Sequence, residues 1–179
     1  MSFEFNIDEI LEIAEQIERN GARFYRNAAK KIPNFEKKAL LVELAEMEDD
    51  HEQIFKKMRE SLSEDEKMMT SFDPENEASS YLKALADTRI FYEKEIDFSS
   101  IKEILKSAIT AEKDSIVFYL GMKDVISDNI GKDKIDVIIR EEMGHIKLLS
   151  KELITYNYEW LLLYIFLKNS LNILQRFLY

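Results

Sequence analysis

The chain has 179 residues, of which 46% are hydrophobic and 34% are charged, and this suits a single globular domain with an apolar core. Its net charge of −10 disfavours a nucleic-acid partner, because a phosphate backbone is met by a surplus of Lys and Arg. The absence of cysteine excludes disulfides, cysteine-ligated zinc and iron–sulfur centres. The N-terminus lacks the basic and apolar regions of a signal peptide, so we expect a cytoplasmic protein.

Two long helices are predicted at the start of the chain. With only 4 Gly and 2 Pro in the whole sequence, turns are scarce, and this favours long helices over a sheet. Apolar residues recur at spacings of three and four over residues 7–31, with Asp8 as the expected N-cap. Pro33 ends this helix, and a second helix is predicted over residues 34–59.

A long crossover is expected over residues 61–99, with a shorter helix at about residues 78–92. Two further long helices follow over residues 100–127 and 132–154, and the segment 128–131 between them has the composition of a turn. Helices in pairs with one long crossover between the pairs indicate an all-α protein, an antiparallel ferritin-like four-helix bundle.

The C-terminal segment, residues 156–179, is expected to form a unit beside the bundle of residues 1–155. Its apolar run from Trp160 to Leu167 is too short to cross a bilayer, which takes about 20 residues. We expect an extra helix that packs on the bundle or on a partner subunit. A helix lying on a membrane surface is the alternative, and its few basic residues give it little support.

Each of the two histidines follows a glutamate by three positions, which places carboxylate and imidazole on one helix face, about 5–6 Å apart at Cβ. The same helix faces are otherwise apolar. One further glutamate on each of the other two helices lies 30 positions earlier, since 48 − 18 and 142 − 112 are both 30. The whole set repeats at an offset of 94 residues: Glu18, Glu48 and His51 match Glu112, Glu142 and His145.

This set predicts two bound metal ions. Four carboxylates buried together would repel one another, and burying an unpaired charge costs many kcal/mol, whereas two divalent cations would balance four negative charges. One Glu from each of two helices and a Glu-x-x-His from each of the others is the ligand pattern of dimetal sites in helix bundles. Oxygen and imidazole ligands suit iron, manganese or zinc. Iron is favoured, because two ferrous ions can deliver two electrons to peroxide or dioxygen.

Tyr25 and Tyr119 each lie seven residues after the glutamate of their helix, which is two turns and about 10 Å along the axis at about 1.5 Å per residue. We expect each to hydrogen-bond a carboxylate of the opposite hairpin and to fix its orientation, although a tyrosine that merely fills the core is the alternative. Glu141 is a further candidate for orienting a histidine, whereas its counterpart Met47 cannot do so.

On these residues the chain resembles the rubrerythrin and bacterioferritin branch of the ferritin-like superfamily, over residues 7 to about 155. The resemblance rests on the six candidate ligands together with Tyr25 and Tyr119. It implies a dimetal carboxylate centre in an antiparallel four-helix bundle. For rubrerythrin-like proteins it implies reduction of peroxide, and for relatives of ferritin it implies oxidation of ferrous iron.

The sequence departs from that family pattern in three ways. Ser115 stands where rubrerythrins usually carry a further glutamate, so the symmetric site is closer to that of bacterioferritin. Without cysteine there is no rubredoxin module, so the electron donor is expected to be another protein. The crossover is longer than expected for cage-forming relatives, and this weakens a role in cage storage.

The leading hypothesis is a rubrerythrin-like diiron protein that reduces peroxide or dioxygen, or oxidises ferrous iron, and forms a homo-oligomer, with a dimer expected. Glu48 and Glu142 are expected to bridge the two ions, and Glu18 and Glu112 to be terminal carboxylates. The alternatives are an iron-binding or storage protein without turnover and a diiron oxygenase that acts on an organic substrate.

Overall fold

The computed structural model describes residues 6–68, 82, 98 and 100–177, and the elements in this part of the chain are helices. The four long helices lie where the apolar periodicity predicted them. The elements are α1 (Ile7–Lys31), α2 (Phe35–Glu60), α3 (Glu64–Met68), α5 (Ile101–Val125) and α6 (Asp128–Phe177).

The start of α1 is fixed by a capping box. The Asn6 side chain accepts a hydrogen bond from the Glu9 backbone N–H at 2.8 Å, and the Glu9 carboxylate accepts from the Asn6 backbone N–H at 3.1 Å. The prediction of Asp8 as the N-cap is therefore wrong. Asp8 lies in the first turn and accepts from Arg59 Nε of α2 at 2.9 Å, so it ties the two helices together.

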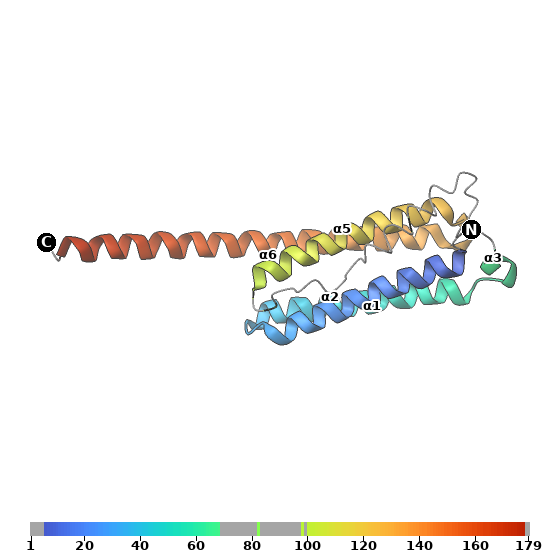
Figure 1. The fold of residues 1–179 in the computed structure, drawn as a ribbon, viewed down its shortest axis with the longest axis horizontal. Helices are drawn as coiled ribbons and strands as arrows, with labels where there is room; N and C mark the ends of the chain where they lie inside the picture. The colour runs from blue at the N-terminus through green and yellow to red at the C-terminus, as the bar shows by residue number, and fades with distance from the viewer. Residues whose placement is uncertain (1–5, 69–81, 83–97, 99, 178–179) are drawn as a thin grey trace, which may run out of the picture.

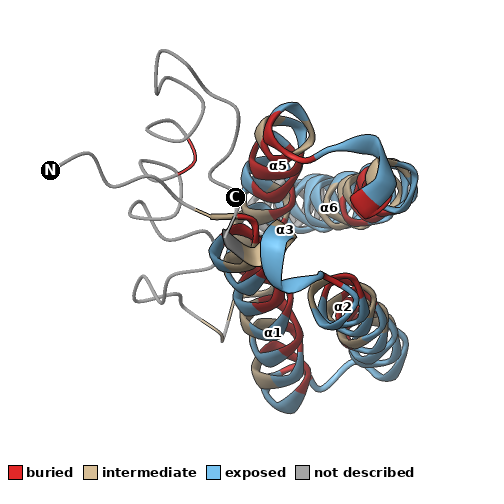
Figure 2. Ribbon diagram, turned by 90° about the vertical axis from the view of Figure 1, so that its right-hand side faces the viewer, coloured by how far each residue is buried: buried red, intermediate tan, exposed pale blue. Residues whose placement is uncertain are grey.

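The helices form two hairpins that pack side by side (Figure 1). α1 and α2 make one hairpin, and α5 and α6 make the other. α2 ends at one end of the bundle and α5 begins at the other, as the predicted crossover requires. The expected helix at residues 78–92 lies outside the described residues, apart from Leu82, which is buried. The buried faces of the four long helices point toward one another (Figure 2).

α6 leaves helical geometry at Gly131, where φ is 125°, a value that glycine adopts without strain. This matches the turn expected at residues 128–131. Beyond it the helix continues to Phe177, because no glycine or proline follows Gly144. The expected extra C-terminal helix is thus an extension of α6 rather than a separate element.

The extension projects beyond the bundle, and the side chains of residues 157–168 are exposed (Figure 1). Residues 157–168 therefore do not pack on the bundle of their own chain, and packing on a partner subunit stays a prediction. At the base of the extension, Lys37 Nζ of α2 lies 3.9 Å from Glu159. Among the described residues, no helix combines the length and the apolar character needed to cross a membrane.

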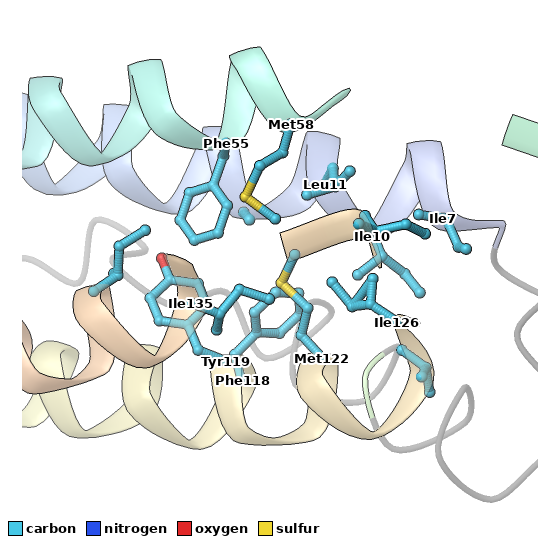
Figure 3. Packing of buried hydrophobic residues seen from close by; sticks show 14 of the residues in the cluster. Ile7, Ile10, Leu11, Phe55, Met58, Phe118, Tyr119, Met122, Ile126 and Ile135 are labelled. Carbon is cyan, nitrogen blue, oxygen red and sulfur yellow. The ribbon is translucent and has the colours of Figure 1, made fainter. Parts of the chain in front are cut away.

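The apolar core is divided into two clusters by a layer of polar side chains. One cluster surrounds Phe55, Met58 and Tyr119 and is drawn in Figure 3. The other contains Leu44 and Leu149. On every long helix the candidate ligands lie between residues of the two clusters, so all four helices deliver them to the same level of the bundle.

Candidate metal centre

The structure brings all six predicted ligands together in the layer between the two apolar clusters. None is more than 2% exposed, so solvent is excluded from the whole group. The side chains come from all four long helices: Glu18 from α1, Glu48 and His51 from α2, Glu112 from α5, and Glu142 and His145 from α6.

The ligand atoms fall into two overlapping groups, in each of which four atoms lie within 4.8 Å of one another. Glu48 and Glu142 belong to both groups, which is the arrangement expected of the two bridging carboxylates. The groups are Glu18, Glu48, His51 and Glu142, and Glu48, Glu112, Glu142 and His145. The site therefore offers two adjacent positions with the same kinds of donor atom.

Both imidazoles present Nδ1 to the carboxylates. His51 Nδ1 lies 2.9 Å from Glu142 Oε1 and 3.6 Å from Glu18 Oε2. His145 Nδ1 lies 2.8 Å from Glu142 Oε2 and 3.6 Å from Glu112 Oε1. The two rings are stacked with centroids 5.8 Å apart and planes 21° from parallel, so they flank the carboxylates in similar orientations.

Gly21 makes room for a carboxylate from the neighbouring helix. A Cβ atom at this position would lie 3.3 Å from Cδ of Glu48, a distance at which Glu48 would have to shift. The sequence placed Gly21 on the inner face of its helix, but this role was not predicted. A glycine inside a helix, one turn after Glu18, is the signal that could have revealed it. The counterpart at the 94-residue offset, Ser115, is also small and buried, and its hydroxyl donates to the Ala111 carbonyl at 3.0 Å.

Two tyrosines link the hairpins through carboxylates. The Tyr25 hydroxyl of α1 donates to Glu112 of α5, and the Tyr119 hydroxyl of α5 donates to Glu18 of α1. Burial, together with the nearby carboxylates, raises the pKa of both tyrosines well above 10. Both phenols therefore keep their protons and act as donors that orient the two carboxylates.

Without a cation, Glu48 and Glu112 bind their protons more tightly than carboxyl groups in water do. Burial, followed by the charge of Glu142, raises the pKa of Glu48 well above its usual range and that of Glu112 to about 8. Burial alone would also raise the pKa of Glu142. The close approach of the His145 and His51 imidazoles outweighs burial and holds the pKa of Glu142 well below its usual range.

The histidines bind protons tightly because carboxylates surround them. Burial alone would lower the pKa of His51, but its carboxylate neighbours outweigh burial and raise it to about 11. The same balance raises the pKa of His145 to about 9. The metal-free site thus attracts positive charge strongly, and protons supply it when no metal does.

Several buried atoms that line the two positions have no hydrogen-bond partner. They are Glu48 Oε1, Glu112 Oε2, both Glu142 carboxylate oxygens, and the Nδ1 atoms of His51 and His145. A buried polar atom without a partner costs about 1–3 kcal/mol. Carboxylate oxygens and imidazole nitrogens are also the donors that first-row divalent metals accept. The residues present therefore fit a pair of metal ions between the histidines.

The outer ring nitrogens of the two histidines have different surroundings. His51 Nε2 lies 2.9 Å from Glu141 Oε2 of α6, so the carboxylate that was a candidate for orienting a histidine does contact one. His145 Nε2 is buried and has no hydrogen-bond partner among the described residues.

Comparison with known proteins agrees with this geometry. A family model described as Rubrerythrin matches residues 9–99, just over half of the chain. The structure is similar to a crystal structure from Thermotoga maritima, provisionally described as a ferritin-like diiron-carboxylate protein. The TM-score is 0.62 and the sequence identity 28%, and the match covers 86% of this chain and 97% of the other. A search of the curated proteins finds no match.

Proposed function

The chain belongs to the rubrerythrin family, and we propose that it is a non-haem diiron oxidoreductase that reduces peroxide at the buried centre. The observation that carries this proposal is the pair of overlapping ligand groups, with Glu48 and Glu142 common to both. Such a pair of positions suits a reaction that needs two electrons at once, because each ion can contribute one.

Each side chain has a definite part in holding the two ions. Glu48 and Glu142 would serve both ions, with Glu18 and His51 completing one position and Glu112 and His145 the other. Ferrous iron held there would supply the two electrons that, with two protons, convert one hydrogen peroxide into two water molecules.

The surrounding residues prepare the site for this chemistry. Burial of all six ligands excludes bulk water, which limits side reactions and strengthens every electrostatic interaction in the centre. Tyr25 and Tyr119 keep their protons and hold the terminal carboxylates in place. Because the imidazoles bind metal only when Nδ1 is unprotonated, loading the site releases the protons that the metal-free centre holds.

Turnover requires a source of electrons outside this chain. The sequence contains no cysteine, so the chain itself cannot bind an iron–sulfur or rubredoxin-type centre. We therefore infer that a separate redox protein reduces the ferric centre after each cycle. The donor, the expected homo-oligomer and the choice of iron over manganese or zinc stay predictions.

Stopped-flow mixing of the anaerobic diferrous protein with hydrogen peroxide tests the proposal. We expect oxidation far faster than that of free ferrous iron, with one peroxide consumed per two irons. Glu142→Gln should lose this rate, because it removes a charge shared by both positions, whereas Glu46→Gln on the exposed surface of α2 should retain it. Oxidation no faster than that of free iron would refute peroxide reduction.

The same preparation distinguishes the alternatives. Rapid oxidation with dioxygen but not with peroxide would indicate a ferroxidase. Uptake of many iron ions per chain would indicate storage. Consumption of dioxygen only after an organic substrate is added would indicate an oxygenase.

A further inference from the structure

The two halves of the metal centre differ in one contact just outside the ligands. His51 Nε2 is held by Glu141 at 2.9 Å, whereas His145 Nε2 is buried and has no partner among the described residues. The 94-residue offset explains the difference. The position equivalent to Glu141 is 141 − 94 = 47, and it is occupied by Met47, which is half-buried and offers no oxygen.

The inner surroundings of the two positions are matched. Each position has its own terminal glutamate and its own histidine, and both share the same two carboxylates. Each terminal glutamate also accepts a hydrogen bond from a tyrosine of the opposite hairpin. Among the described residues, the carboxylate of Glu141 is therefore the hydrogen-bond partner that distinguishes the histidine of one position from that of the other.

Such an outer contact changes how well a histidine binds metal. A carboxylate that accepts from Nε2–H holds the ring in the tautomer whose free lone pair is on Nδ1, and it also makes Nδ1 more basic. Losing a contact of this kind typically weakens metal binding by about 10–100-fold. His51 has the contact on the atom opposite its metal-facing nitrogen, and His145 lacks it.

We propose that the two metal positions are unequal. The position beside His51 and Glu18 binds its ion more tightly and fills first, whereas the position beside His145 and Glu112 holds the ion that exchanges. Glu141 is the positioning residue that sets this order. The inference rests on the proposed dimetal function, and it adds that one ion stays with the protein while the other is replaced.

The test measures metal binding without turnover. The full chain is loaded with one equivalent of Co²⁺ and crystallised, and the anomalous peaks at the two positions are compared. A competing chelator then gives the two dissociation constants in solution. For the wild type we expect the stronger peak beside His51 and dissociation constants that differ by about 10–100-fold.

Exchanging the two outer residues separates positioning from a general structural effect. Glu141→Met should weaken the His51 position and bring the two constants together, and Met47→Glu should tighten the His145 position. The double variant E141M/M47E should reverse the order in which the positions fill. Glu141→Gln should keep part of the difference, because its amide oxygen can still accept from Nε2–H. Glu46→Met, at an exposed site beside Met47, should leave the order unchanged.

Folding should survive these changes, because the Glu141 side chain is 45% exposed and Met47 is only half-buried, and circular dichroism checks this for each variant. Equal peaks in the wild type, or an unchanged order in the double variant, would overturn the inference. Unequal Co²⁺ binding in a protein that does not reduce peroxide would leave the inference standing and refute only the proposed activity. Equal Co²⁺ binding at the two positions in a protein that does reduce peroxide would refute the inference and leave the proposed activity standing.

Discussion

Replacing Glu112 with Gln should stabilise the metal-free protein, because the site carries an electrostatic cost when no cation is present. Burial and the neighbouring Glu142 raise the pKa of Glu112 from 4.5 to about 8. At pH 7 the folded chain therefore holds a proton that the unfolded chain has released. At 1.36 kcal/mol per pH unit above 4.5, this costs about 3 kcal/mol.

The cost depends on pH in a way that identifies its cause. At pH 5, only half a pH unit above 4.5, the unfolded chain holds this proton about a quarter of the time, so the cost falls to about 1 kcal/mol or less. Gln carries no titrating proton, and its amide oxygen can still accept from the Tyr25 hydroxyl. Glu112→Gln should thus stabilise the metal-free protein by about 2 kcal/mol more at pH 7 than at pH 5. For a chain of this size that is about 4–8 °C in Tm.

Thermal unfolding with a chelator at both pH values measures this difference. Adding Zn²⁺ should raise the Tm of the wild type more than that of Glu112→Gln, because the variant has lost a charged ligand. Glu46→Gln, on the exposed surface, should behave like the wild type throughout. A metal-free Glu112→Gln variant that is less stable than the wild type by the same amount at both pH values would contradict the idea that the buried carboxylate is costly.

Three further predictions concern the same layer. The metal-free protein should lose stability as the pH rises from 7 to 10. The pKa of His145 is raised to about 9 and that of His51 to about 11, so the stability that the two charged histidines contribute is complete below about pH 6.5. This stability is lost as the pH rises from there through the two raised pKa values. Saturating Zn²⁺ should remove this slope in thermal unfolding, and a slope that persists would count against the assignment of these protons. Tyr25→Phe should weaken Co²⁺ binding by about 10–100-fold in a chelator competition, because its carboxylate acceptor loses the donor that orients it, and unchanged affinity would show that the tyrosine only fills the core. Gly21→Ala should also weaken Co²⁺ binding, because its Cβ would lie 3.3 Å from Cδ of Glu48, and an unaltered affinity would show that Glu48 can move without loss.

The periodicity of the sequence was sufficient to predict the helices and the convergence of the candidate ligands. A glutamate or histidine in phase with Leu44 and Phe55 has to face the core wherever the helix packs, so the position of Glu48 followed from its spacing alone. The 94-residue offset then aligned the two hairpins. The structure brings the six side chains together, and their binding of metal stays a prediction.

Features that depend on distances between helices could not be predicted in this way. The N-cap is different: Asn6 and Asp8 are both good capping residues, but only Asn6 has a glutamate three positions later, so the capping box with Glu9 was readable from the sequence. The closeness of Gly21 to a carboxylate depends on how tightly α1 packs on α2. The sequence left open whether the C-terminal helix packs on its own bundle or on a partner subunit, since an apolar sequence does not indicate in which chain its partner lies.

Anomalous diffraction at the iron edge, on protein purified without added metal, tests the central claim most directly. Two peaks about 3.5–4 Å apart, both between Glu48 and Glu142, are the expected result. A crystal in which these carboxylates bind no ion, or in which a single ion lies at the surface of the bundle, would contradict a buried two-metal centre.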